Sequence, residues 1–237
     1  MQEVYETNVK IVPSLSDAAG QLSIPDTFGL FMDIASTHAE LLGSGYDAMR
    51  ENGQFWLTVK TMIHFEERPR MGETVTLRTW PEEPGKVRCN RSYELIRDSR
   101  RLICGKTEWA IWNYRENKLV PAAGIYPEDL SFPYGTACKE DFSLIPDTFV
   151  GVEPYADYTV RSTDIDVGRH MNNVAYVRAL AGSFSGEGWK QLPIRKMEVH
   201  FRTPCYEGDR IIFQKKQTPN GLDLRLSKGE TTLTLAR

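Results

Sequence analysis

The chain has little of several features that would place it in particular classes of protein. Its 237 residues contain only four cysteines, and no two of them stand at metal-ligand spacing. No apolar run approaches the roughly 20 residues needed to cross a bilayer, and the opening MQEVYETNVK lacks the apolar core of a signal peptide. We therefore expect reduced thiols in a cytoplasmic protein without a membrane span.

The chain also lacks an excess of charge of one sign. The 29 Lys and Arg residues nearly balance the 32 Asp and Glu residues, so the formal net charge is −3. Because proteins that bind nucleic acid or a membrane surface usually carry a basic excess, we expect neither as a partner. What the sequence does have is 41% apolar and 11% aromatic residues, which is ample for a packed core.

The first half of the chain reads as a strand, a helix and a run of four strands. The helix begins at Ile24, with Pro25 suited to its first turn and Asp26 to its positive end, and it stops at Gly43. A shorter helix is expected over 46–51. Period-two alternation of apolar residues predicts strands near 4–12, 55–67, 73–82, 86–98 and 101–114.

The second half repeats this order, with a helix at 172–184. Strands are expected near 156–162, 194–203, 209–218, 221–227 and 230–236. Short sequence matches recur too: His64-Phe65 followed by Gly72-Glu73 reappears as His200-Phe201 followed by Gly208-Asp209. Repetition of the whole pattern implies a duplication.

These patterns predict an α+β fold of two strand–helix–meander units, each with a long helix wrapped by an antiparallel sheet. The expected division is an N-terminal unit at 1–120, a linker at 121–154 and a C-terminal unit at 155–237. The linker holds five of the thirteen prolines, and its aromatic residues suggest that it packs onto the surface. Since one chain already supplies two units, a monomer and a homodimer both agree with the sequence.

One stretch, 164–176, gathers polar groups directly before an apolar helix. It contains Asp164, Asp166 and His170, and either Asn172 or Asn173 can cap the helix that follows. A helix start carries unpaired N–H groups and a partial positive charge of roughly half a unit. The loop therefore brings an acid and an imidazole to a position suited to an oxyanion.

The pattern D-x-D-x-x-x-H-x-N-N-x-x-Y, ahead of a buried helix and a four-strand meander, resembles the hot-dog thioesterases. The tandem arrangement is similar to the acyl-acyl-carrier-protein thioesterases of bacteria and plant plastids. Matching segments in the first half are Ala35-Ser-Thr-His-Ala39, Phe55-Trp56, Arg68-Pro-Arg-Met-Gly-Glu73, Thr79-Trp80 and Glu108-Trp109.

The resemblance implies a double hot-dog fold and a fatty-acid-synthesis enzyme without a cofactor. Such an enzyme hydrolyses the thioester between a fatty acyl chain and its acyl carrier protein, and releases free fatty acid and holo-carrier. Among the catalytic groups of the plant relatives, the resemblance maps an Asp to Asp166 and a His to His170. It also expects an Asn at position 168 and a Glu before Cys205, where this chain has Gly168 and Pro204. What remains resembles the simpler single-domain hot-dog thioesterases.

Asp166 and His170 suffice for a hydrolytic mechanism. Asp166 could deprotonate a water or attack the thioester directly, and His170 could orient the water or donate to the carbonyl oxygen. N–H groups at the helix start would hold the oxyanion. We expect Asn172, Asn173 and Tyr176 to support this loop.

The comparable helix start in the first half, Pro25-Asp-Thr-Phe-Gly, has no histidine near it. We therefore expect one active site per chain. The first half is expected to supply much of the acyl pocket. The candidate lining residues are Phe28, Phe31, Met32 and Trp56.

Other interpretations of single residues stay open. Asp164, Asp166 and His170 could ligate a metal, but no further acids or histidines cluster with them, so we expect no metal. Cys205 could be a nucleophile, although a strand cysteine is more often part of the core. The remaining three histidines, His38, His64 and His200, are expected to be structural.

Three other functions also remain. The chain could be an acyl-CoA thioesterase, a hydroxyacyl dehydratase or a non-catalytic acyl-binding module. A dehydratase would need its acid and histidine on opposing helices, whereas here both stand in one loop, which favours hydrolysis. A non-catalytic acyl-binding module remains an alternative, because Gly168 and Pro204 replace two expected catalytic residues. The preferred acyl chain length is not encoded in any motif.

Overall fold

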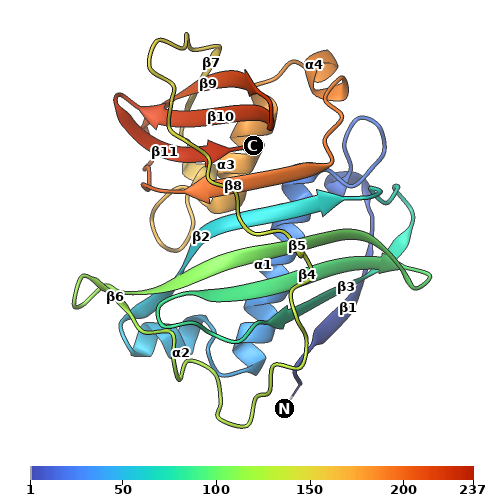
Figure 1. The fold of residues 1–237 in the computed structure, drawn as a ribbon, viewed down its shortest axis with the longest axis vertical. Coiled ribbons are helices and arrows are strands. Elements are labelled where there is room, and N and C mark those ends of the chain that lie inside the picture. Colours follow the sequence, from blue (N-terminus) through green and yellow to red (C-terminus); the bar gives the residue numbers. More distant parts are fainter. Residues whose placement is uncertain (1) are drawn as a thin grey trace. The chain divides into compact units, whose positions relative to one another are not determined.

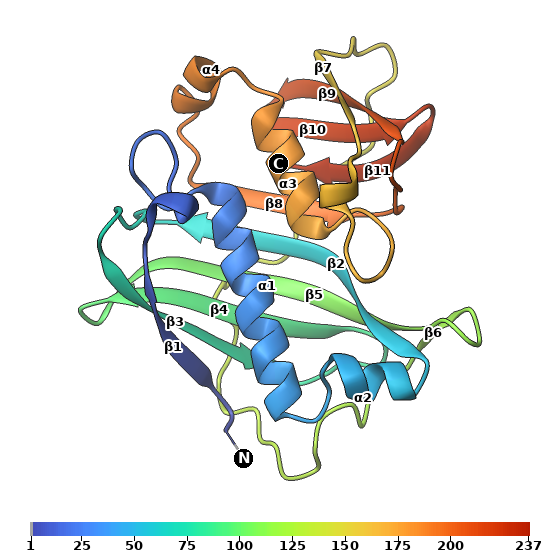
Figure 2. The same cartoon turned by 180° about the vertical axis from the view of Figure 1, so that it is seen from behind.

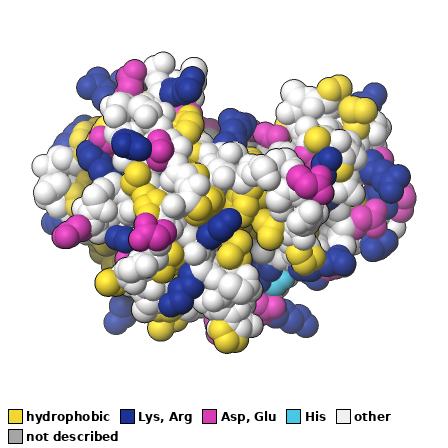
Figure 3. Space-filling model, turned by 90° about the horizontal axis from the view of Figure 1, so that it is seen from above, with side chains coloured by type: hydrophobic (Ala, Val, Ile, Leu, Met, Phe, Trp, Pro, Cys, Tyr) yellow, Lys and Arg dark blue, Asp and Glu magenta, His cyan; other side chains and the backbone are white. Residues whose placement is uncertain are grey.

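A computed structural model describes residues 2–237, which divide into two compact units, one ending at Asp141 and one spanning Phe142–Arg237. Both units consist of helices against an antiparallel sheet, so the α+β class is confirmed (Figure 1). No helix in this part of the chain is both long and apolar enough to span a membrane. Figure 3 shows that positive and negative side chains are interspersed on the face it draws, as the small net charge suggests.

The first unit contains a sheet with the strand order β1-β3-β4-β5-β2, and a short β6 pairs with β5. Its strands are β1 (Tyr5–Lys10), β2 (Gln54–Phe65), β3 (Thr74–Pro81), β4 (Cys89–Arg97), β5 (Arg100–Asn113) and β6 (Lys118–Val120). Its helices are η1 (Pro13–Leu15, 3-10), α1 (Ile24–Leu41) and α2 (Tyr46–Glu51). Figure 2 shows α1 lying across this sheet.

A side-chain cap fixes the start of helix α1, and a glycine in strand β5 makes room for one of its aromatic side chains. Ser23 is the N-cap, and its Oγ accepts a hydrogen bond from the Asp26 N–H at 3.0 Å. Phe31 is fully buried and stacks on Tyr93 with ring centroids 4.6 Å apart. A Cβ on Gly105 of β5 would lie 2.3 Å from the Phe31 ring, so only glycine lets the ring lie this close to the strand.

The second unit has the strand order β8-β11-β10-β9-β7. Its strands are β7 (Ala156–Thr159), β8 (Lys196–Phe201), β9 (Arg210–Thr218), β10 (Gly221–Lys228) and β11 (Thr231–Ala236). Its helices are η2 (Ser162–Asp164, 3-10), α3 (Asn173–Gly182) and α4 (Gly186–Lys190). Helix α3 has 10 residues, against 18 in α1, and buries Ala175, Tyr176, Val177 and Leu180.

Every strand and helix predicted from sequence periodicity is present within a few residues of its expected bounds. The predicted helix over 172–184 ends earlier, because Gly182 is its last residue and Ser183 forms the C-cap. Four short elements, η1, η2, α4 and β6, were not predicted. Each spans three to five residues, which is too short for a periodic pattern to register.

The proline-rich segment 121–154, called the strap below, has no helix or strand of its own. Leu130 and Cys138 are buried in the first unit, and Ile145 and Phe149 in the second. Four of its aromatic residues were expected to pack: Phe132, Tyr134, Phe142 and Phe149. Only Phe149 is fully buried, while Tyr134 is 45% exposed. The strap is therefore held at intervals rather than along its whole length.

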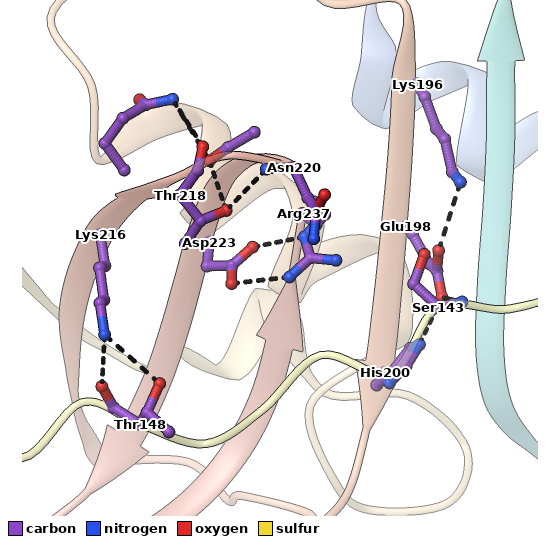
Figure 4. Close-up of polar contacts among 12 residues, drawn as sticks. Ser143, Thr148, Lys196, Glu198, His200, Lys216, Thr218, Asn220, Asp223 and Arg237 are labelled. Atoms are coloured by element: carbon purple, nitrogen blue, oxygen red, sulfur yellow. Dashed lines mark hydrogen bonds and ion pairs between the residues drawn. The ribbon is translucent and has the colours of Figure 1, made fainter.

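Polar contacts also fasten the strap to the second unit (Figure 4). Glu198 of β8 is fully buried, and its Oε1 accepts hydrogen bonds from the Ser143 N–H and from His200 Nε2, both at 2.7 Å. Lys216 of β9 reaches the Thr148 carbonyl at 3.4 Å. His200 is thus a structural histidine, as expected.

Candidate active site

The loop between η2 and α3 is a tight hairpin. Ile165 and Met171 form an isolated antiparallel bridge, and the Asp166 N–H donates to the His170 carbonyl at 3.1 Å. At the tip, Arg169 has a φ of 62°, which is the left-handed conformation that closes the turn. The hairpin brings Asp166 and His170, four residues apart in sequence, to facing positions.

The two side chains lie side by side at partly exposed positions. His170 Nδ1 is 3.8 Å from Asp166 Oδ1, and the side chains are 28% and 25% exposed. This separation is too long for a hydrogen bond but close enough for one small movement, or one water, to connect them. Asp166 Oδ1 also accepts the Gly168 N–H at 2.8 Å, which orients the carboxylate.

Gly168 occupies the space beside this pair. A Cβ at this position would lie 2.8 Å from His170 Nε2 and 3.0 Å from Asp166 Oδ1. Any side chain here would therefore displace one of the two groups. The resemblance implies an Asn at this position. This loop lacks that amide, and the Asp166 and His170 side chains occupy the space that a side chain at 168 would need.

Backbone and side-chain contacts fix the base of the loop. Asn172 is the N-cap of α3: its Oδ1 accepts the Val174 N–H at 2.8 Å, and its own N–H donates to the Asp164 carbonyl at 2.8 Å. The Asp164 carboxylate accepts the Tyr158 hydroxyl at 2.7 Å and the Arg161 N–H at 2.8 Å. Asp164 is thus a turn carboxylate, and Asn173 is the first residue of the helix.

Tyr158 and Arg161 also support the loop through Asp164, and neither was predicted from the sequence. A signal existed for Arg161, because an acid three residues after a helix cap commonly bonds back to the backbone of the cap. No local signal marks Tyr158, whose hydroxyl reaches Asp164 from strand β7.

Tyr176 and Cys205 link α3 to the segment that follows β8. The Cys205 N–H donates to the Tyr176 hydroxyl at 3.0 Å, and that hydroxyl lies 3.0 Å from Cys205 Sγ. The Met171 N–H in turn donates to the Cys205 carbonyl at 2.9 Å. Cys205 is fully buried, and burial raises the pKa of its thiol. Since a thiolate is the reactive form, these contacts fit an anchoring residue better than a nucleophile.

The four candidate acyl-pocket residues all belong to the first unit. Phe28 and Phe31 are buried in its core, and Met32 is half-buried. Trp56 is also half-buried; its Nε1–H donates to the Ser44 carbonyl at 2.9 Å. Among residues 2–237, no group of three or more His, Cys, Asp or Glu side chains is placed to hold a metal ion.

Two family models match the chain in succession. One described as the acyl-ACP thioesterase N-terminal domain matches residues 2–124, and one described as the acyl-ACP thioesterase C-terminal domain matches residues 151–234. The boundary between the two matches falls within the strap.

Curated relatives and solved structures agree with these matches. A chloroplastic acyl-[acyl-carrier-protein] hydrolase of Cuphea viscosissima is 25% identical over 88% of this chain and 57% of its own length. A chloroplastic palmitoyl-acyl carrier protein thioesterase of Arabidopsis thaliana is 24% identical over 93% of this chain and 56% of its own length. The chain thus spans little more than half the length of these relatives.

Two solved structures cover nearly the whole chain. An acyl-ACP thioesterase from Bacteroides thetaiotaomicron aligns over 99% of this chain and 96% of its own, with a TM-score of 0.83 and 20% identity. A 12:0-ACP thioesterase from Umbellularia californica aligns over 100% and 96%, with a TM-score of 0.84 and 17% identity. The double hot-dog fold implied by the resemblance is confirmed.

Proposed function

We propose, since this chain belongs to the acyl-ACP thioesterase family, that it hydrolyses fatty acyl-acyl-carrier-protein thioesters. The products are free fatty acid and holo-carrier protein, so the reaction would terminate fatty-acid synthesis. The observation that carries the proposal is the facing pair of Asp166 and His170 immediately before a capped helix. The acyl carrier protein is the proposed partner, and the four free thiols favour a reducing compartment such as the cytoplasm.

The proposed mechanism uses the loop and the start of α3. The Asp166 carboxylate either takes a proton from water as that water attacks the thioester carbonyl, or attacks the carbonyl itself to give a short-lived anhydride that water then cleaves. His170 orients the water or donates to the carbonyl oxygen. The thiolate of the carrier's prosthetic group leaves without much assistance from an acid.

The helix start supplies candidate oxyanion donors. Asn172 already accepts the Val174 N–H, so the donors proposed for the oxyanion are the N–H groups of Asn173 and Ala175. Each well-placed donor contributes on the order of 3 kcal/mol to transition-state stabilisation. Tyr176 and Cys205 are proposed to position the loop. The Cys205 carbonyl accepts a hydrogen bond from the Met171 N–H, and the Tyr176 hydroxyl accepts one from the Cys205 N–H.

A non-catalytic acyl-binding role is the second candidate, because two observations favour it. Gly168 and Pro204 stand where the resemblance expects catalytic side chains. The remaining pair, 3.8 Å apart, must then carry the chemistry with fewer helpers than the plant relatives have.

The proposal is tested by incubating the purified full chain with acyl chains of increasing length, on acyl carrier protein and on coenzyme A, and following thiol release. Faster release from the carrier protein supports the proposed substrate. Release from coenzyme A alone would identify an acyl-CoA thioesterase. Acyl binding without thiol release would identify the binding module, and neither binding nor release would contradict both.

A further inference from the structure

Two cysteines of the first unit lie in contact, far from the loop of the second unit in sequence. Cys138 Sγ–H donates to Cys104 Sγ, with the two sulfurs 3.3 Å apart. Cys104 belongs to β5 and Cys138 to the strap. Both side chains are almost fully buried, and both thiols are free. Neither takes any part in the proposed hydrolysis.

A pocket lies beside this thiol pair. Its lining includes Ala137 and Lys139, the residues on either side of Cys138, together with Trp80 and Arg101. Trp80 and Ala137 also pack in one cluster with the two cysteines. A small molecule in the pocket would therefore lie next to the segment that carries Cys138. The charged lining residues are Arg78, Arg101 and Lys139 against Glu94, so their balance favours an anionic molecule.

We infer that Cys104 and Cys138 are a redox-active pair that forms a disulfide by exchange with a small anionic disulfide, thereby fastening the strap to β5. The other two cysteines lack such a partner. Cys89 packs with Met49 and Ile111, and Cys205 Sγ is in hydrogen-bond contact with the Tyr176 hydroxyl.

Cys104 lies on the same strand as Arg101, which lines the pocket, and is assigned as the attacking thiol. The hydrogen bond from Cys138 is the largest influence on its pKa and lowers it, and the Arg101 guanidinium lowers it further, whereas burial acts in the opposite sense. The hydrogen bond to Cys104 and burial raise the pKa of Cys138. These opposite directions agree with attack by Cys104 and with Cys138 as the thiol that keeps its proton until the second step.

The exchange proceeds in two balanced steps. The Cys104 thiolate attacks one sulfur of the reagent, so the reagent's S–S bond breaks, a mixed disulfide forms and one thiolate leaves. Cys138 then loses its proton to that thiolate or to water and attacks Cys104 Sγ, which forms the protein disulfide and releases the second thiolate. The protein is oxidised by two electrons and the reagent is reduced to two thiols.

Formation of the disulfide requires one of the two sulfurs to move toward the other. The sulfurs must approach by roughly 1.3 Å to reach disulfide length. Cys138 lies in a segment without regular secondary structure, tied nearby by the Ala137 N–H to Ser92 Oγ at 2.9 Å and by Trp80 Nε1–H to the Gly135 carbonyl at 2.9 Å. We expect Cys138 to make most of this movement, because Cys104 is held within β5 whereas Cys138 belongs to no strand or helix.

The test uses the full native chain incubated with oxidised glutathione, an anionic disulfide. We expect an intact-mass loss of about 2 Da, alkylation of two fewer of the four cysteines after denaturation, and a proteolytic peptide that joins Cys104 to Cys138. The melting temperature should rise by several degrees, because the bond restricts the unfolded chain, and should return on reduction with dithiothreitol.

Matched variants separate this pair from general thiol reactivity. Cys89→Ser, at another buried cysteine, should still form the link, whereas Cys104→Ser and Cys138→Ser should not. The mapping of the unmodified chain stands on its own even where a variant folds poorly. Native protein that loses no mass, that stops at a glutathione adduct, or that links a different pair of cysteines would overturn the inference.

Discussion

Gly168 illustrates how one residue sets the geometry of its neighbours. Because it lacks a side chain, the Asp166 carboxylate can accept its N–H and still face His170. A Cβ there would approach both groups at 3.0 Å or less. The same absence removes a group that the resemblance expects, so the proposed chemistry depends on two side chains and the helix start.

Asp166→Asn is expected to lower turnover by roughly 10²–10⁴-fold, because an amide can neither take a proton from water nor attack the thioester. The amide is similar in size and can still accept the Gly168 N–H, so the fold should be retained. Turnover on the preferred thioester and circular dichroism measure the two effects. The matched variant is Cys205→Ala, which should keep most of the activity, because the contacts of Cys205 with Met171 and with the Tyr176 hydroxyl include its backbone carbonyl and N–H, which alanine retains. The opposite pattern would favour a thiol nucleophile.

His38 is expected to make the first unit sensitive to acid. It is fully buried, with Nε2 2.9 Å from the Gln2 carbonyl and Nδ1 3.0 Å from Arg91 Nη1. Burial, assisted by the Arg91 charge, lowers the pKa of His38 from 6.5 to about 4. The unfolded chain therefore binds a proton first as the pH falls, and stability is lost progressively between pH 6.5 and about 4.

The size of this loss can be measured against a variant that does not titrate. It should reach at most about 3 kcal/mol in the free energy of unfolding. His38→Gln keeps a donor and an acceptor without the titration, so urea unfolding at pH 7.5 and pH 4.5 should show a smaller acid loss in the variant. Equal losses in both proteins would show that His38 titrates normally.

At the scale of elements, α1 and α3 each open with a side-chain cap, as the short α4 also does. Ser23 caps α1, and Asn172 caps α3 directly after the loop. Both positions fit the residue types that favour helix starts. Only the second cap stands beside the candidate catalytic pair, so the two caps should contribute alike to stability and differently to activity.

Asn172→Ala and Ser23→Ala form a matched pair that tests this difference. Each should lower the free energy of unfolding by about 1 kcal/mol, since each leaves a backbone N–H without its cap. Turnover should fall clearly in Asn172→Ala, because the loop and the proposed oxyanion donors shift, and should change little in Ser23→Ala. Equal activity in the two variants would show that the α3 start takes no part in catalysis.

At the scale of the whole molecule, the duplication is visible in both units, yet the units differ where function is proposed. Each has an antiparallel sheet with a helix, but the first has an 18-residue helix with a core position made possible by Gly105, and the second a 10-residue helix behind the loop. The strap has buried anchors in each unit. Loss of an anchor should therefore matter more than its lack of secondary structure suggests.

Phe149→Ala is expected to lower the free energy of unfolding by about 3–5 kcal/mol, because it removes a fully buried ring that packs with Ile145 and Leu235. The neighbouring Val150 is 99% exposed, so Val150→Ala should change stability by less than about 0.5 kcal/mol. Denaturant titration of the two variants measures the contrast. A small effect at Phe149 would mean that the strap is dispensable for the second unit.

Local pattern alone determined much of this protein. Periodicity placed the main strands and helices, and a thirteen-residue motif singled out Asp166 and His170, because both signals depend on neighbours along the chain. Short elements such as β6 and α4 escaped, since three to five residues carry too little pattern.

Only the tertiary structure decided which distant residues meet. Cys104 and Cys138 are 34 residues apart, and Tyr176 and Cys205 are 29 apart, yet each pair is in hydrogen-bond contact. The space that Gly105 leaves for Phe31 likewise depends on how a helix crosses a strand. Such contacts follow from packing in three dimensions, where the separation along the chain no longer limits which side chains touch.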